Sequence, residues 1–200
     1  MTEKLFLNTC SQPWQVGLLS PTKKCFQFWH SDLASKGLIS FFHQTLTHHD
    51  ILIENIRHIF CLHGHGSRTG VRLSESFCHG FSIPFHAEII SIDDMLLVAL
   101  NVFIKSGDQY ITVLGCNNDD SFQLKKYIIK DSTSIMEDTW TIQKCDLPGL
   151  KKSDRLYIPS NIYNNISKLT KVKIIPVNVC FYSVSQFFLD ESNIANWRRC

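Results

Sequence analysis

The fold of this chain is decided by one stretch, Cys61-Leu62-His63-Gly64-His65-Gly66-Ser67-Arg68-Thr69-Gly70-Val71-Arg72. It begins in a short apolar segment, residues 59–62, with the length and composition of a buried strand, and it ends in a segment of helical periodicity. Backbone N–H groups at the start of such a helix can bind an anion. The glycines can equally serve only to let the strand turn tightly, because glycine tolerates backbone angles that other residues do not. The residues themselves leave both interpretations open.

Two segments carry apolar residues at the spacing of an amphipathic helix. The first covers residues 33–48 and follows Ser31-Asp32, which can cap its N-terminus. The second covers residues 69–82 and is expected to end between Gly80 and Pro84. The apolar arc of the first helix is about 160° and that of the second is almost as wide, whereas packing on one surface needs only ~100°. We therefore expect each helix to contact two neighbours.

Five segments of the first half have the pattern of strands, at residues 4–11, 15–20, 24–29, 58–62 and 88–92. The first three are joined by short turns that contain proline, and they should form an antiparallel meander. A short helix over residues 93–101 follows, capped by Ser91 or Asp93. Because strands alternate with helices after the meander, the sequence predicts an α/β fold in which helices cover a mixed sheet.

The pattern changes after Asn101. Further strand candidates lie at residues 108–114, 122–129, 139–144 and 172–179, with a hairpin loop at 117–120. Residues 146–165 are rich in loop-forming residues. A helix over residues 183–193 is expected as the last element. We place the boundary between two small lobes at Lys105-Ser106-Gly107. This gives an N-terminal lobe over residues 1–104 and a C-terminal lobe over residues 105–200.

The composition is that of an ordinary globular protein. Lysine and arginine number 20 and aspartate and glutamate 18, so the net charge of +2 provides no strong field toward nucleic acid or an anionic membrane. The longest central apolar run, residues 95–100, is too short to span a bilayer, and no secretory signal is evident. The eight cysteines include no C-x-x-C pair and are expected to be buried hydrophobes. We expect a cytoplasmic protein.

A metal site is one alternative for the quoted stretch. Cys61, His63 and His65 occupy alternate positions, so an extended backbone would project all three to one side. Thiolate and imidazole are zinc ligands, and the three residues would suit a small metal-dependent hydrolase. Against this, the glycines set the geometry of the turn, H-E-x-x-H is absent, and Ser67 lacks the G-x-S-x-G surroundings of a nucleophile. We expect no metal and no other cofactor.

A nucleotide contact is the second alternative. It would use six residues of the first strand and the turn, Asn8, Thr9, Gly64, Gly66, Ser67 and Thr69. The turn has no P-loop lysine, however, and the first strand ends in an asparagine where a metal–phosphate site would need a carboxylate. A purely structural role of the turn therefore explains the stretch better than an anion-binding site does.

At this turn the sequence resembles the bacterial TsaB proteins. Their pattern is an Ile-Asp-Thr-Ser first strand, a His-Ser helix start and a Gly-Pro-Gly-Ser-Phe-Thr-Gly-Leu-Arg turn. Residues His30-Ser31 match the helix start, and six positions match the turn, Gly64, Gly66, Ser67, Thr69, Gly70 and Arg72. The match covers roughly residues 4–100. The chain departs from the pattern at Asn8, Cys10, His65 and Arg68, where the family has Asp, Ser, Pro and Phe.

The resemblance implies an actin-like (ribonuclease H-like) ATPase fold that has lost catalysis. Such proteins pair with the catalytic subunit TsaD and with the ATPase TsaE to place threonylcarbamoyl on the adenosine next to the tRNA anticodon. The catalytic relative carries an H-x-x-x-H metal motif, and none of the nine histidines here has that spacing. In the family the two helices of the first lobe pair with their counterparts in the partner. This implies an interface at Leu38, Phe41, Phe42, Leu73, Phe77 and Phe81.

Three functional hypotheses follow from these observations. The first is a non-catalytic scaffold subunit that reaches tRNA only through its complex, with the same helices available for a homodimer when the partner is absent. The second is the metal-dependent hydrolase built on Cys61, His63 and His65. The third is a free-standing nucleotide or tRNA binder.

Overall fold

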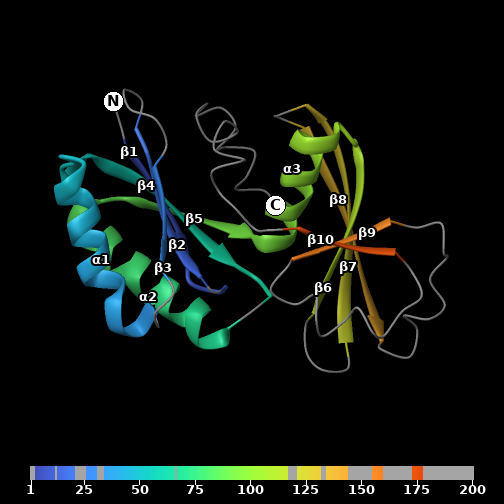
Figure 1. The fold of residues 1–200 in the computed structure, drawn as a ribbon, viewed down its shortest axis with the longest axis horizontal. Helices are drawn as coiled ribbons and strands as arrows, with labels where there is room; N and C mark the ends of the chain where they lie inside the picture. Colours follow the sequence, from blue (N-terminus) through green and yellow to red (C-terminus); the bar gives the residue numbers. More distant parts are fainter. Residues whose placement is uncertain are drawn as a thin grey trace. The chain divides into compact units, whose positions relative to one another are not determined.

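A computed structural model of the chain describes residues 3–11, 13–20, 26–30, 34–65, 67–116, 121–131, 134–143, 155–159 and 173–177. The chain divides into two compact units, a first unit over Met1–Ile92 and a second unit over Asp93–Cys200. A five-stranded sheet lies in each half of the chain (Figure 1). The predicted α/β class, with mixed sheets and helices, is confirmed.

The first sheet has the strand order β3-β2-β1-β4-β5. Its strands are β1 (Glu3–Asn8), β2 (Trp14–Leu19), β3 (Phe26–His30), β4 (Ile56–His63) and β5 (Glu88–Asp93). β2 is antiparallel to both β1 and β3, which confirms the predicted meander. β4 runs parallel to β1, with Leu5 opposite Ile59 and Leu7 opposite Cys61. The sheet is therefore mixed, as strands alternating with helices predicted.

Two helices, α1 (Ala34–His48) and α2 (Arg68–Phe85), lie on the same side of this sheet (Figure 1). A single 3-10 turn, η1 (Ile53–Asn55), precedes β4. Alternate residues of β1 point to the helices, since Leu5 and Leu7 belong to the core that the helices complete. Phe6 faces the other way and stacks on Phe60 of β4, with ring centroids 4.8 Å apart.

Helix α2 is longer than the sequence predicted. It continues through Pro84 and ends at His86, which adopts a left-handed conformation with φ 51°. The expected end between Gly80 and Pro84 is therefore wrong. A proline in the last turn removes only one intrahelical hydrogen bond, and the N–H of His86 still bonds to the carbonyl of Ser82. The helix thus carries one further turn, which includes Ile83.

The second sheet has the strand order β10-β9-β6-β7-β8. Its strands are β6 (Tyr110–Cys116), β7 (Ser121–Asp131), β8 (Ser134–Gln143), β9 (Arg155–Pro159) and β10 (Lys173–Val177). β6, β7 and β8 are antiparallel neighbours, which confirms the predicted hairpin pattern, whereas β9 is parallel to both β6 and β10. Pro176 is tolerated in β10 because that strand lies at the edge of the sheet.

Two features of the second unit differ from expectation. β8 begins at Ser134, earlier than the predicted strand over 139–144. β9 lies inside residues 146–165, which were predicted as loop, because a five-residue strand is too short to show a clear alternation. The predicted hairpin loop at 117–120 and the predicted helix over 183–193 lie outside the described residues.

Helix α3 (Asp94–Ser106) belongs to the second unit and contacts β6, β7, β9 and β10. The division between Ile92 and Asp93 therefore precedes the boundary predicted at residues 104/105. The segment Lys105-Ser106-Gly107 instead ends the helix, with Gly107 as a left-handed cap at φ 73°. Every residue from Asp94 to Val102 is buried, and a helix that is apolar on all sides needs such a setting. No helix in the described part of the chain is both long and apolar enough to cross a membrane.

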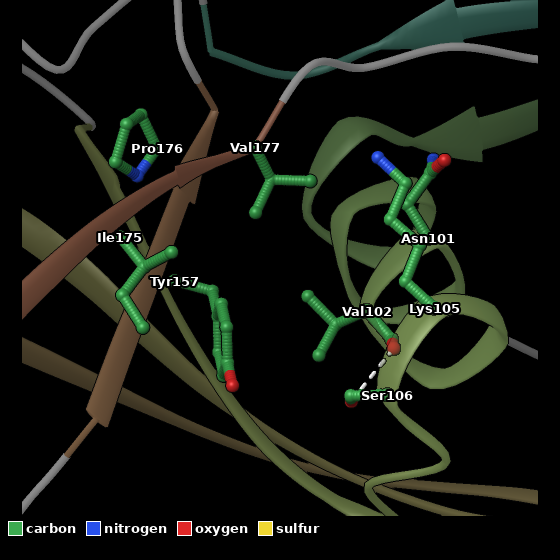
Figure 2. A pocket seen from close by; sticks show the side chains of 8 residues that line it. All are labelled: Asn101, Val102, Lys105, Ser106, Tyr157, Ile175, Pro176 and Val177. Carbon is green, nitrogen blue, oxygen red and sulfur yellow. Dashed lines mark hydrogen bonds between the residues drawn. The ribbon is translucent and has the colours of Figure 1, made fainter.

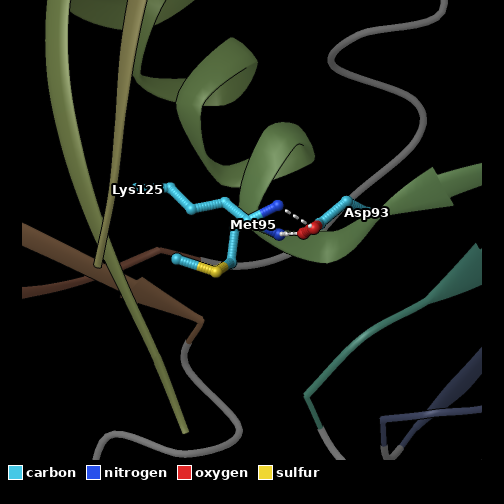
Figure 3. A network of polar contacts seen from close by, with 3 residues as sticks. All are labelled: Asp93, Met95 and Lys125. Carbon is cyan, nitrogen blue, oxygen red and sulfur yellow. Dashed lines mark hydrogen bonds and ion pairs between the residues drawn. The ribbon is translucent and has the colours of Figure 1, made fainter. Parts of the chain in front are cut away.

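Asp93 is the N-cap of α3, as predicted. Its Oδ1 accepts a hydrogen bond from the N–H of Met95 at 2.7 Å, and its Oδ2 accepts one from Lys125 Nζ at 2.6 Å (Figure 3). The lysine lies on β7 and is almost completely buried. A single carboxylate thus caps the helix and neutralises a buried cation on the sheet beside it.

Replacing Asp93 by alanine is expected to lower the free energy of unfolding by about 2 to 3 kcal/mol, since both a helix cap and a charge-assisted hydrogen bond are lost. Asp93→Asn keeps a capping oxygen and removes the charge, so its loss should be about half as large. Urea unfolding followed by circular dichroism measures both variants. Equal losses in the two variants would show that the cap contributes nothing, and an Asp93→Asn protein as stable as the unaltered one would show that the charge of the pair with Lys125 contributes nothing.

Candidate functional site

The turn after β1 is fastened to the first turns of α2 by buried hydroxyl groups. Thr9 Oγ1 donates a hydrogen bond to the carbonyl of Gly70 at 2.6 Å, and Thr9 and Ser74 also share a hydrogen bond between their hydroxyls. Thr9 and Ser74 are both buried. The threonine side chain is therefore engaged within the protein and does not face a ligand.

Gly70 permits this close approach. A β-carbon built on Gly70 would lie 2.0 Å from the carbonyl oxygen of Thr9 and 2.8 Å from its carbonyl carbon. Both atoms belong to the backbone, which cannot swing away as a flexible side chain can. The glycine in the quoted stretch therefore allows the backbone of the β1 turn to rest directly on α2, and it is required for packing.

Three backbone N–H groups at the start of α2, those of Ser67, Gly70 and Val71, have partners inside the protein. The N–H of Ser67 donates to the carbonyl of Cys10 at 3.0 Å, and the N–H of Val71 donates to the carbonyl of Ser67 at 2.9 Å. The N–H of Gly70 donates to Ser67 Oγ at 3.1 Å, so Ser67 is the helix cap. The N–H groups of Ser67 and Gly70, which an anion at this turn would use, are thus already bonded, which favours the structural turn over an anion site.

The other turn residues proposed for a nucleotide contact, Gly64, Gly66 and Thr69, have different environments or lie outside the described residues. Gly64 has a φ of 146°, a conformation that only glycine adopts easily, while Thr69 is exposed on the first turn of α2. Gly66 lies outside the described residues.

Asn8 replaces the aspartate of the family pattern and has a structural role of its own. Its side chain is completely buried. Oδ1 accepts a hydrogen bond from the N–H of Cys10 at 3.1 Å, and Nδ2 donates to Ser11 Oγ at 2.9 Å. An amide supplies both the acceptor and the donor, whereas a carboxylate supplies acceptors alone. The residue therefore shapes the turn after β1.

The three residues of the hydrolase hypothesis do not come together as a metal site. Cys61 lies in the core of the first unit, His63 is exposed at the end of β4, and His65 is buried in the turn. Among the described residues no group of three or more histidine, cysteine or acidic side chains is arranged to hold a metal ion. The hypothesis is wrong for this part of the chain, because Cys61 is covered by the core while His63 is exposed, and His65 lies beyond Gly64, where β4 has ended.

Cys61 instead pairs with Cys78 of α2. A hydrogen bond from the Cys78 thiol lowers the pKa of Cys61, and the same hydrogen bond together with burial raises the pKa of Cys78. Both thiols are almost fully buried and both cysteines are free. They act as small core side chains, as the sequence predicted for its cysteines.

The residues predicted for a partner interface lie mostly inside the first unit. Leu38, Phe42 and Phe81 are only 3%, 5% and 7% exposed and belong to its core. The remaining three, Phe41, Leu73 and Phe77, are partly buried and pack against that core. The ring of Phe42 meets those of Phe77 and Phe81 edge to face at 5.2 and 5.5 Å.

These contacts explain the wide apolar arcs. Each helix does have two neighbours, but they are the sheet and the other helix of the same unit. The expectation of two neighbours is therefore confirmed, and the arcs by themselves give no evidence for a second protein. Two large apolar side chains point away from the core, Ile39 of α1 at 75% exposure and Ile83 of α2 at 76%.

Sequence reasoning did not single out these two isoleucines. Ile39 lies within the apolar arc of α1 but one position beyond Leu38, on the side that the sheet does not cover. Ile83 was missed because the helix was expected to end before Pro84. The sequence did contain a signal for Ile39. Leu38, Phe42 and Leu46 follow one another at intervals of four and therefore share one face of the helix, and Ile39 lies outside this row.

The chain matches no protein-family model and no curated protein in sequence. Solved structures give two likenesses. The structure of YeaZ from Pseudomonas aeruginosa has a TM-score of 0.74 at 14% identity and covers 100% of this chain and 93% of its own. An uncharacterized protein described as similar to the peptidase YeaZ from Pseudomonas aeruginosa has a TM-score of 0.69 at 12% identity, over 92% and 89% of the two chains. YeaZ is another name for TsaB, and the chain therefore has the fold of the YeaZ (TsaB) proteins along its whole length.

Proposed function

We propose that this protein is a non-catalytic scaffold subunit of the machinery that places threonylcarbamoyl on the adenosine next to the tRNA anticodon. It would pair with a TsaD-like catalytic subunit and work with a TsaE-like ATPase. It would meet tRNA only within that complex. The observation that carries the proposal is the YeaZ fold over the full length of the chain, together with the six turn residues that match the TsaB pattern.

The closed turn between β1 and α2 supports the non-catalytic part of the proposal. Thr9, Ser67 and Asn8, which a nucleotide would contact, are all engaged in hydrogen bonds within the protein. Opening this turn for a phosphate would require breaking several buried hydrogen bonds, each of which is costly to leave unmade. A free-standing nucleotide binder is correspondingly disfavoured.

The outward side of the helix pair is the surface we assign to the partner. Ile39 and Ile83 are exposed there, while the larger aromatic side chains of both helices are used in the core. Exposed residues beside them on α1 are small or polar, including Ser35 and Ser40. Apolar anchors with small polar neighbours are what a protein–protein contact uses.

Ile39→Asp combined with Ile83→Asp is expected to abolish co-purification with the TsaD-like subunit from the native host. An interface anchor costs about 2 kcal/mol or more on removal, so the pair together should weaken binding at least about a hundredfold. The variant should keep the circular dichroism spectrum of the unaltered protein, since both side chains are exposed. Leu52→Asp is the matched control, because Leu52 is a 59% exposed leucine outside both helices.

Undiminished complex formation by the double variant would rule out this surface. Sedimentation of the purified chain distinguishes a homodimer through the same helices, which the double variant should also dissociate. Titration of ATP and of tRNA at a fixed salt concentration tests the nucleotide or tRNA binder. Tight binding of either by the isolated chain would contradict the scaffold role.

A further inference from the structure

The second unit contains a cavity of about 490 Å³ that no part of the proposed function uses. It lies between the C-terminal half of α3 and the strands β9 and β10 (Figure 2). Cavities that hold small molecules usually measure about 300 to 1,000 Å³ and combine an apolar lining with a few placed polar groups. The cavity therefore has the size of a ligand site, and its lining defines what could occupy it.

The floor of the cavity is apolar. Val102 of α3, Tyr157 of β9 and Val177 of β10 line it and are all buried, and Ile175 adds a partly buried aliphatic side chain. Figure 2 shows the two valines and Ile175 directed at the space between helix and strands. A ligand body that fits this lining must be apolar, because the described residues of the floor carry no charge.

The helix side of the cavity carries a positively charged side chain, that of Lys105. Lys105 lies four residues after Asn101, so the two side chains share one face of α3, and Figure 2 shows both on the same side of the cavity. The lysine side chain is exposed, and a bound ligand would partly exclude water from it. An anionic group on the ligand would be attracted to this side.

On the strand side, the polar group of Tyr157 already has a partner. The hydroxyl of Tyr157 donates a hydrogen bond to Asp108 Oδ2 at 3.3 Å. In Figure 2 this hydroxyl points away from the end where Asn101 and Lys105 carry their polar groups. Burial, and the charge of Asp108 in second place, raise the pKa of Tyr157, so the phenol stays neutral at physiological pH.

We propose that this cavity binds a small organic molecule with an apolar body and a carboxylate, the body resting on Val102, Ile175 and Val177 and the carboxylate facing Lys105. The floor selects the apolar body, and the lysine selects the negative charge. The site is separate from the partner surface on α1 and α2, so its test does not depend on the proposed function.

Calorimetric titration of the full-length protein with decanoate tests the proposal, with decylamine as a probe of equal length and opposite charge. Decanoate is expected to bind with one molecule per chain and decylamine to show no saturable binding. Lys105→Ala should weaken decanoate binding about fivefold to tenfold, and Lys105→Arg should retain it, because a charge-assisted contact is lost in the first and kept in the second. Lys36→Ala, an exposed lysine of α1, is the control and should bind normally.

A filled cavity provides a second test. Val177→Phe places a larger side chain on the floor and should prevent decanoate binding, while the melting temperature shows that the protein is still folded. Equal binding of decanoate and decylamine, or decanoate binding that is unchanged in Lys105→Ala, would overturn the proposal.

Discussion

Gly70→Ala is expected to lower the free energy of unfolding of the first unit by about 3 kcal/mol or more, the upper range for overpacking a core. The added β-carbon would meet the carbonyl oxygen of Thr9 at 2.0 Å and its carbonyl carbon at 2.8 Å. Relief would require the β1 turn to move away from α2. That movement would break the hydrogen bonds from Thr9 to Gly70 and from Ser67 to Cys10.

Gly80→Ala is the matched control for this prediction. Gly80 lies in the same helix, and a β-carbon added there meets nothing within 4 Å. This substitution should raise stability by about 0.5 to 1 kcal/mol, because alanine restricts the unfolded chain and favours the helix. Urea unfolding of the two variants gives the comparison. A small effect of Gly70→Ala, similar in size to that of Gly80→Ala, would mean that the β1 turn does not rest on the helix.

Phe42→Ala is expected to cost about 3 to 5 kcal/mol of unfolding free energy, as buried phenylalanines usually do. Phe42 is 5% exposed and makes edge-to-face contacts with Phe77 and Phe81, which would both lose a partner. Ile39→Ala, three positions before it on the same helix, should change stability by less than about 0.5 kcal/mol. Thermal unfolding of both variants measures the difference.

The same pair of variants separates core from interface. If Phe42 were an exposed anchor for a partner, Phe42→Ala would leave stability nearly unchanged and reduce complex formation. The structure leads us to expect the reverse, with stability lost at Phe42 and partner binding lost at Ile39. A stable Phe42→Ala protein with reduced complex formation would therefore support the partner interface at Phe42 that the resemblance implies.

Local patterns predicted most of the secondary structure of the first unit. Helix α1 and the meander β1-β2-β3 were confirmed, and the cap of α3 is Asp93, one of the two residues expected. These features depend on side chains within a few residues of one another, which is the range over which periodicity and capping act. The end of α2 was misplaced because Gly80 and Pro84 are weak stop signals when the helix is held by a core.

The candidate site was harder to predict, because its properties depend on residues distant in sequence. Thr9 and Gly70 are 61 positions apart, yet their contact decides that the turn is closed. Cys61 and His63 share one side of an ideal strand, but one side chain enters the core beneath α2 and the other is exposed. The alternation of side chains along a strand predicts that both point to the same side of the sheet, but it does not show which other element covers each of them.

The sequence by itself determined the α/β class, the order of strands and helices in the first unit and the glycine turn that joins β4 to α2. Only the tertiary structure decided that the aromatic faces of α1 and α2 pack on each other and the sheet, that α3 belongs to the second unit, and that a cavity lies beside Lys105. The reason is physical. Periodicity records which side of an element is apolar, whereas burial is fixed by whichever other element covers that side, and that element comes from elsewhere in the chain.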